Sequence, residues 1–88
     1  MAWTIEYHPR VEKDLKAIDR PIQREILDYM DARIAGHGDP RRFGKSLRHE
    51  FRGLWRYRVR DYRIICQFDV ARGVVLVQAI GHRSTIYD

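Results

Sequence analysis

The hydrophobic residues in the first half of the chain recur at helical spacing after one short alternating segment. Residues 3–7 alternate apolar and polar side chains, which predicts a first strand. Pro9 and Pro21 each suit the first turn of a helix, and Gly36 and Gly38 end the second of these helices. Two apolar stripes follow the prolines: Val11, Leu15 and Ile18 in the first helix, and Ile22, Ile26, Leu27, Met30 and Ile34 in the second.

The second half carries the alternation of side chains that strands produce. It predicts three strands at about residues 54–60, 63–69 and 74–80. The first two form a tight hairpin with a two-residue loop at 60–61 or 61–62, and Gly73 supplies a positive φ in the next hairpin. The last strand is apolar enough to be central. The order β-α-α-β-β-β predicts an α+β fold, in which a two-helix hairpin packs on one face of a small, mainly antiparallel, twisted sheet.

The strand near residues 54–60 sorts its side chains onto two opposite faces. Its apolar side holds Trp55, Tyr57 and Val59, and its other side holds Arg56, Arg58 and Arg60. Either hairpin register adds Arg63 to the arginine side, whereas Ile64, Cys66 and Phe68 join the apolar side. Like charges on neighbouring strands repel one another, so this pattern is unfavourable for stability alone. A polyanion bound to the arginine side would relieve the repulsion.

Composition limits the chain to one domain over residues 1–88, because hydrophobic residues make up 44% of its 88 residues. The longest apolar stretch is too short to span a bilayer, and no signal peptide is recognisable. The single cysteine excludes an internal disulfide and fits a reducing compartment, so we expect a cytoplasmic protein without a membrane partner. Charge is divided unevenly: residues 1–40 hold six Lys/Arg and eight Asp/Glu, whereas residues 41–88 hold eleven and four. The basic half predicts binding to nucleic acid or to an acidic protein.

The basic face carries groups that phosphodiester cleavage requires. If the last strand pairs with the one before it, His82 and Arg83 reach the rim of the arginine face, and Tyr87 is near enough in sequence to fold over it. Cations can stabilise the charge that develops on phosphorus-bound oxygens, and an imidazole or phenol can transfer protons. The histidines are scattered and no carboxylate pair has ligand spacing, so we expect no metal site and no cofactor.

Three segments together resemble a known family. Residues 43–47 read Phe-Gly-Lys-Ser-Leu, and residues 53–65 read Gly-Leu-Trp-Arg-Tyr-Arg-Val-Arg-Asp-Tyr-Arg-Ile-Ile. Residues 80–83 read Ile-Gly-His-Arg, with a tyrosine four positions later. This pattern resembles the RelE/ParE toxin superfamily, and its RelE branch most closely. The resemblance covers essentially the whole chain.

The resemblance implies a toxin of a type II toxin–antitoxin module that is a ribosome-dependent, metal-independent endoribonuclease. Such an enzyme cuts messenger RNA in the ribosomal A site, where the substrate's own 2′-hydroxyl attacks the phosphodiester. The catalytic set implied is Arg63, Arg83, Tyr87 and His82. The substrate-binding set implied is Arg56, Arg58, Lys45 and Arg60.

The same resemblance implies a cognate RelB-like antitoxin that covers the basic face or displaces the C-terminal tail. Operator DNA would be contacted only indirectly, through the toxin–antitoxin complex. Two alternatives stay open: a ParE-like poison of DNA gyrase with no chemistry of its own, and a degenerate protein that only binds antitoxin. The combination of Arg63, Arg83 and Tyr87 favours the nuclease.

Overall fold

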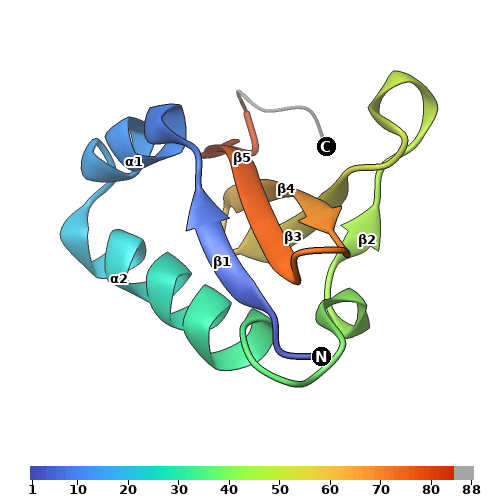
Figure 1. The fold of residues 1–88 in the computed structure, drawn as a ribbon. Coiled ribbons are helices and arrows are strands. Elements are labelled where there is room, and N and C mark those ends of the chain that lie inside the picture. The colour runs from blue at the N-terminus through green and yellow to red at the C-terminus, as the bar shows by residue number, and fades with distance from the viewer. Residues whose placement is uncertain (85–88) are drawn as a thin grey trace.

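A computed structural model describes residues 1–84 and arranges them as one helical layer against one sheet (Figure 1). The strands and helices follow in the order β1 (Thr4–Tyr7), α1 (Pro9–Lys16), α2 (Arg20–Tyr29), β2 (Lys45–Ser46), β3 (Trp55–Val59), β4 (Tyr62–Asp69) and β5 (Val74–His82). Three short helical turns lie between these elements, at Met30–Ile34, Pro40–Arg42 and His49–Phe51. The predicted α+β fold is confirmed, with the addition of the two-residue strand β2.

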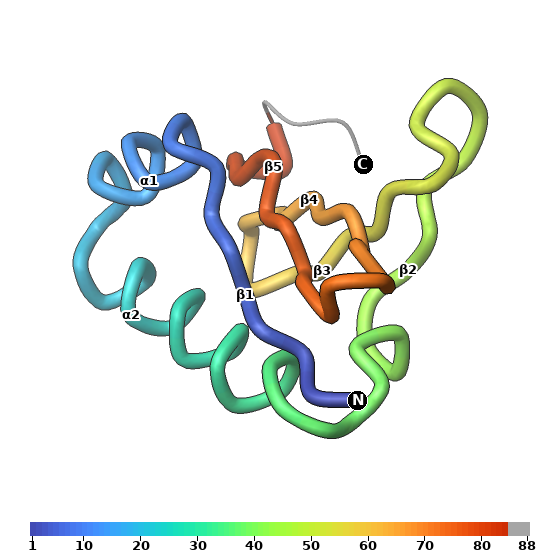
Figure 2. The backbone as a smooth tube through the Cα atoms, viewed as in Figure 1, coloured from blue at the N-terminus to red at the C-terminus, as the bar shows by residue number. Residues whose placement is uncertain are grey.

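The sheet has five strands in the order β1-β5-β4-β3-β2. β1 runs parallel to β5, and the other neighbouring strands are antiparallel. The chain leaves β1, forms both helices on one side of the sheet and returns to build the strands β2 to β5 (Figure 2). No helix in the described part of the chain is long and apolar enough to cross a membrane.

The helices follow the prolines and the apolar stripes. Pro9 opens α1, and the Nδ1 atom of His8 accepts a hydrogen bond from the Arg10 main-chain N–H at 3.1 Å, which caps the helix. Val11 and Leu15 are buried on the sheet side of α1. α2 continues into a π-helical turn, so the second apolar stripe extends to residue 34 as predicted.

The core lies between the helices and the strands β3, β4 and β5. It is built from thirteen buried residues, among them Tyr57, Ile64, Cys66, Val75 and Val77. Cys66 is fully buried, and this burial raises the pKa of its thiol, so the side chain fills space and is not a nucleophile. The prediction that the odd-numbered residues of β3 and the even-numbered residues of β4 face the core is therefore confirmed.

The segment between α2 and β3 is held by the polar tips of core aromatics. The Tyr57 hydroxyl donates a hydrogen bond to the main-chain oxygen of Pro40 at 2.7 Å, and Trp55 Nε1 donates one to that of Phe43 at 2.7 Å. Gly44 follows with a φ of +76°, and a Cβ atom there would lie 2.3 Å from the main-chain oxygen of Arg56. Only glycine fits this passage, which leads the chain into β2.

Candidate nucleic-acid interface

Strand register places four cations on the sheet face opposite the helices. Arg58 pairs directly with Arg63, and Arg56 pairs with Ile65 on β4 and with Lys45 on β2. Residues directly opposite each other on antiparallel strands share a face. Lys45, Arg56, Arg58 and Arg63 therefore form one basic group, which we call the open face. The predicted gathering of Arg56, Arg58 and Arg63 is confirmed in the structure.

Arg63 stands apart from the other cations of the open face by its burial. Its relative exposure is 5%, and it is the one charged side chain classed as buried within residues 1–84. It lies between Arg58 on β3 and Gly81 on β5, where the glycine adds no side chain. Removing an arginine from water carries a large desolvation cost, which makes this position a candidate functional site.

Arg60 does not join the open face, which corrects the prediction from simple alternation. It lies in the loop between β3 and β4 with a φ of +53°, so its backbone leaves the strand conformation. Its Nε and Nη2 atoms donate hydrogen bonds to the two carboxylate oxygens of Glu25 on α2, at 2.5 and 3.0 Å. This pairing raises the pKa of Arg60 and lowers that of Glu25. Arg60 thus ties the hairpin loop to the helical layer.

His82 also departs from the predicted face, and the cause is a β-bulge. The register between β4 and β5 shifts beside Ile65, because Ile65 pairs with Ala79 whereas Cys66 pairs with Val77. The extra residue reverses the alternation in the rest of β5. His82 therefore pairs with Tyr62, and its ring meets the Tyr62 ring edge-on with centroids 5.6 Å apart. The shift places Gly81, not His82, beside Arg63.

Arg83 is the first residue after β5, which ends at His82. Its main-chain N–H donates to the Asp61 main-chain oxygen at 2.7 Å. Its Nε atom lies 3.8 Å from Asp61 Oδ1, and His82 Nε2 lies 4.0 Å from Asp61 Oδ2. Nδ1 of His82 is 2.8 Å from the Ser84 hydroxyl. The carboxylate of Asp61 thus faces both Arg83 and His82, although the sequence indicated Asp61 only as a loop residue. The remaining predicted catalytic residue, Tyr87, lies outside the described residues.

Several cations of the basic half have other neighbours. The guanidinium of Arg41 lies 4.7 Å from the centroid of the Phe68 ring, and that of Arg42 lies 5.4 Å from the centroid of Phe43. Arg72 donates to Glu6 at 2.8 Å at the far end of the sheet. The positive charge of residues 41–88 is therefore not all on the open face, because part of it lies beside aromatic rings or carboxylates elsewhere.

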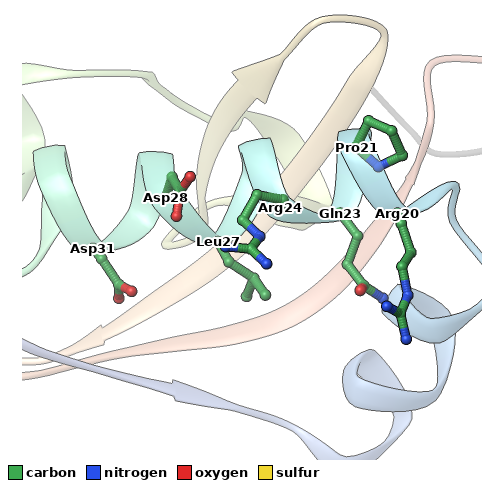
Figure 3. Close-up of a pocket in the computed structure, with 7 residues that line it drawn as sticks. All are labelled: Arg20, Pro21, Gln23, Arg24, Leu27, Asp28 and Asp31. Carbon is green, nitrogen blue, oxygen red and sulfur yellow. The ribbon is translucent and has the colours of Figure 1, made fainter.

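A concave region lies on the helical layer and differs in charge from the open face. A pocket of about 580 Å³ follows α2, with basic residues near the helix start and acidic residues near its end (Figure 3). It is lined by Arg20, Pro21, Gln23, Arg24, Leu27, Asp28 and Asp31. Its balanced charges lack the positive excess of the open face. Within residues 1–84, no three His, Cys, Asp or Glu side chains gather in a way that could hold a metal ion.

Comparison with known proteins places the chain in a family. Residues 5–87 match the model of the family described as the ParE toxin of the type II toxin–antitoxin system parDE. Toxin RelG of Mycobacterium tuberculosis is 25% identical over 87 residues, which cover 99% of this chain and 98% of that protein.

Solved structures share the fold. The toxin–antitoxin complex RelBE2 from M. tuberculosis contains a chain with a TM-score of 0.85 at 23% identity, with 94% of this chain and 100% of that chain covered. The archaeal RelE–RelB complex from Pyrococcus horikoshii OT3 gives a TM-score of 0.73 at 22% identity, with 98% and 100% covered. The free E. coli toxin RelE, in a mutant form, gives 0.64 at 16% identity, with 93% and 84% covered. The chain therefore belongs to the ParE toxin family of type II toxin–antitoxin systems, within the RelE/ParE superfamily.

Proposed function

We propose that this toxin is an endoribonuclease that cleaves messenger RNA in the ribosomal A site without a metal ion. The observation that carries the proposal is the open face, where Arg63 is buried beside Arg58 and in line with Arg56 and Lys45. Its fold is that of RelE toxins from bacteria and an archaeon. Planar guanidinium groups bind phosphate oxygens in pairs, which suits a ribonucleotide backbone.

In the proposed reaction the ribose 2′-oxygen forms a bond to the adjacent phosphorus while the bond from phosphorus to the 5′-oxygen breaks. The 2′-hydroxyl proton passes to a base, and the departing 5′-oxygen receives a proton, so the products are a 2′,3′-cyclic phosphate and a 5′-hydroxyl. Arg63 and Arg83 would bind the extra negative charge of the transition state. Arginine stays charged, so we assign the removal of the 2′-hydroxyl proton to Tyr87 as base, and the leaving oxygen takes its proton from water while Arg83 supports it. His82 pairs with Tyr62 and not with Arg63, so it is left out of this step.

The remaining cations would bind RNA on either side of the reacting phosphate. Lys45, Arg56 and Arg58 lie along β2 and β3 on the same face as Arg63. Arg60 is removed from this set because Glu25 holds its guanidinium. We expect Lys45, Arg56 and Arg58 to contribute affinity and its salt dependence more than catalysis.

A second function has a specific observation in its favour. The family that matches residues 5–87 is described by the ParE toxin, which supports a gyrase poison without chemistry of its own. The open face would then bind gyrase or its DNA. The two functions are distinguished by whether the protein cuts RNA.

We also propose a RelB-like antitoxin as the regulatory partner. Two of the structural relatives are toxins in complex with an antitoxin, RelBE2 and RelE–RelB. An acidic antitoxin segment would cover the open face or displace the tail that carries Tyr87. Contact with operator DNA would follow only within that complex.

One paired experiment tests the proposal. Purified toxin is added to a translation reaction, message cleavage is mapped by primer extension, and gyrase supercoiling is measured in parallel. We expect cleavage without loss of supercoiling; the reverse result would establish the gyrase poison instead. Arg83→Ala should lower cleavage by about 10²-fold, as expected when a transition-state charge partner is lost. Arg72→Ala removes the same charge at the far end of the sheet, beside Glu6, and should leave cleavage unchanged.

A further inference from the structure

The loop between β3 and β4 contacts the end of β5 through one residue, Asp61. Its main-chain oxygen accepts the Arg83 N–H at 2.7 Å, one step beyond the last strand pair, Tyr62 with His82. Its carboxylate then faces both side chains, with Oδ1 3.8 Å from Arg83 Nε and Oδ2 4.0 Å from His82 Nε2. One aspartate thus restrains Arg83 through its backbone and its guanidinium.

The Arg83 distance is that of an ion pair, and both carboxylate distances exceed hydrogen-bond length. The guanidinium of Arg83 is drawn toward Asp61, yet its N–H groups are not bound to it and can still meet a phosphate. The side chains of Arg83 and Asp61 are 63% and 60% exposed, so their attraction adds little to folding stability. The main consequence of the contact is therefore the orientation of Arg83.

The loop itself is fixed from the other side by the helical layer. Arg60 precedes Asp61 and makes two hydrogen bonds to Glu25 of α2, at 2.5 and 3.0 Å. The φ of +53° at Arg60 is a conformation that residues other than glycine rarely adopt. A chain of contacts thus runs from α2 through both loop residues to the end of β5.

We propose that Asp61 is a positioning residue that orients Arg83 for reaction, and that the Glu25–Arg60 pair holds Asp61 in place. This rests on the proposed function, in which Arg83 binds the reacting phosphate. Positioning has a clear chemical value, because small displacements of a group that binds the transition state lower the rate sharply. The placement of Asp61 beside Arg83 is also unexpected on electrostatic grounds, since its carboxylate repels the substrate's phosphate.

That repulsion gives a sharp test. If Asp61 only weakens the positive field, Asp61→Asn would strengthen RNA binding and raise or preserve cleavage. If Asp61 positions Arg83, the same variant lowers kcat by about 10-fold while KM stays equal or falls. Asp69→Asn is the matched control, because Asp69 lies in the other hairpin and pairs with Arg72 at 3.8 Å. It should change neither constant.

A spectroscopic measurement tests the same contact without any cleavage. The NMR order parameter of the Arg83 Nε–H group should fall in Asp61→Asn and stay unchanged in Asp69→Asn. Glu25→Gln should lower the same order parameter less, and the exchanged pair Glu25→Arg with Arg60→Glu should restore it. Unchanged order at Arg83 in Asp61→Asn, or a kcat equal to or above wild type, would overturn the proposal. If wild-type toxin cut no RNA, the nuclease proposal would fail. The order parameter would still show whether Asp61 restrains Arg83.

Discussion

The two faces of the sheet are built from the same strands, but their side chains satisfy opposite requirements. Under the helices, the polar tips of Trp55 and Tyr57 bond to main-chain oxygens at 2.7 Å, and their rings are packed. On the open face, the register sets Arg58 directly opposite Arg63, two like charges whose mutual repulsion a bound anion would relieve. Tyr57 and Arg58 are neighbours, so one step along β3 separates scaffold from candidate site. The covered face serves stability, whereas in the proposed function the open face gives up some stability for binding.

The largest effect is expected from Arg63, the buried cation of the open face. Arg63→Ala should lower RNA cleavage by about 10²- to 10³-fold, because it removes a charge partner of the transition state from a site that excludes water. Cleavage is followed by primer extension, and circular dichroism checks the fold. Arg63→Lys keeps the charge but loses the planar fork, so it should recover only part of the rate. Cleavage at the wild-type rate in Arg63→Ala would remove Arg63 from the catalytic set.

The next effect concerns Gly44, where the chain crosses the edge of the sheet. A Cβ atom there would lie 2.3 Å from the Arg56 main-chain oxygen, and the φ of +76° is also unfavourable for alanine. Gly44→Ala should lower the free energy of unfolding by about 2–3 kcal/mol, measured in urea. Gly53→Ala is the matched control: φ there is +98°, but nothing lies within 4 Å of the added atom. Equal losses in both variants would show that backbone strain, not the clash, governs Gly44.

A smaller loss is expected when the polar tip of a core aromatic is removed. Tyr57→Phe leaves the Pro40 main-chain oxygen without its donor and should lower the free energy of unfolding by about 1–2 kcal/mol. Tyr7 provides the control, because its hydroxyl is buried without a hydrogen-bond partner among residues 1–84, and burial raises the pKa of Tyr7 to about 12. Tyr7→Phe should leave stability unchanged or slightly higher. Cleavage per folded molecule should stay at the wild-type level in both variants.

The sequence predicted the parts of this comparison that depend on regular alternation. The sorting of Tyr57 from Arg58, and the return of Arg63 to the arginine side, require only a two-residue loop and strands of period two. The start of each helix at its proline and the burial of Cys66 were also predicted from local sequence patterns.

Two site residues escaped prediction because the backbone departs from regular geometry. The β-bulge near Ile65 moves His82 to the side of Tyr62, and no residue type in β5 marks the inserted position. The left-handed conformation of Arg60 turns its side chain toward Glu25, a partner 35 residues earlier in the chain. Asp61 was missed for the same reason, since its role depends on where β5 ends.

A small and opposite effect is expected at Arg58, on the exposed part of the open face. Arg58→Thr removes a like charge from directly opposite Arg63, so the free energy of unfolding should rise by about 0.5 kcal/mol. Binding to single-stranded RNA should weaken, and the slope of log affinity against log salt should become less steep by about 0.7. Arg72→Thr should leave that slope unchanged. A loss of stability in Arg58→Thr would contradict the view that this face gives up stability for binding.

The smallest expected effect is the pH dependence of the contact between Glu25 of the helical layer and Arg60 of the β3–β4 loop. Hydrogen bonds from Arg60 lower the pKa of Glu25, so the pair stabilises the folded state above the ordinary glutamate pKa. This contribution is lost as the pH falls through the lowered pKa. Both groups are exposed and screened by salt, so the difference in unfolding midpoint between wild type and Glu25→Gln should be small at neutral pH and disappear in acid. A difference that persisted in acid would mean that the glutamate contributes through packing and not through its charge, and the loop would then be held by contacts other than this pair.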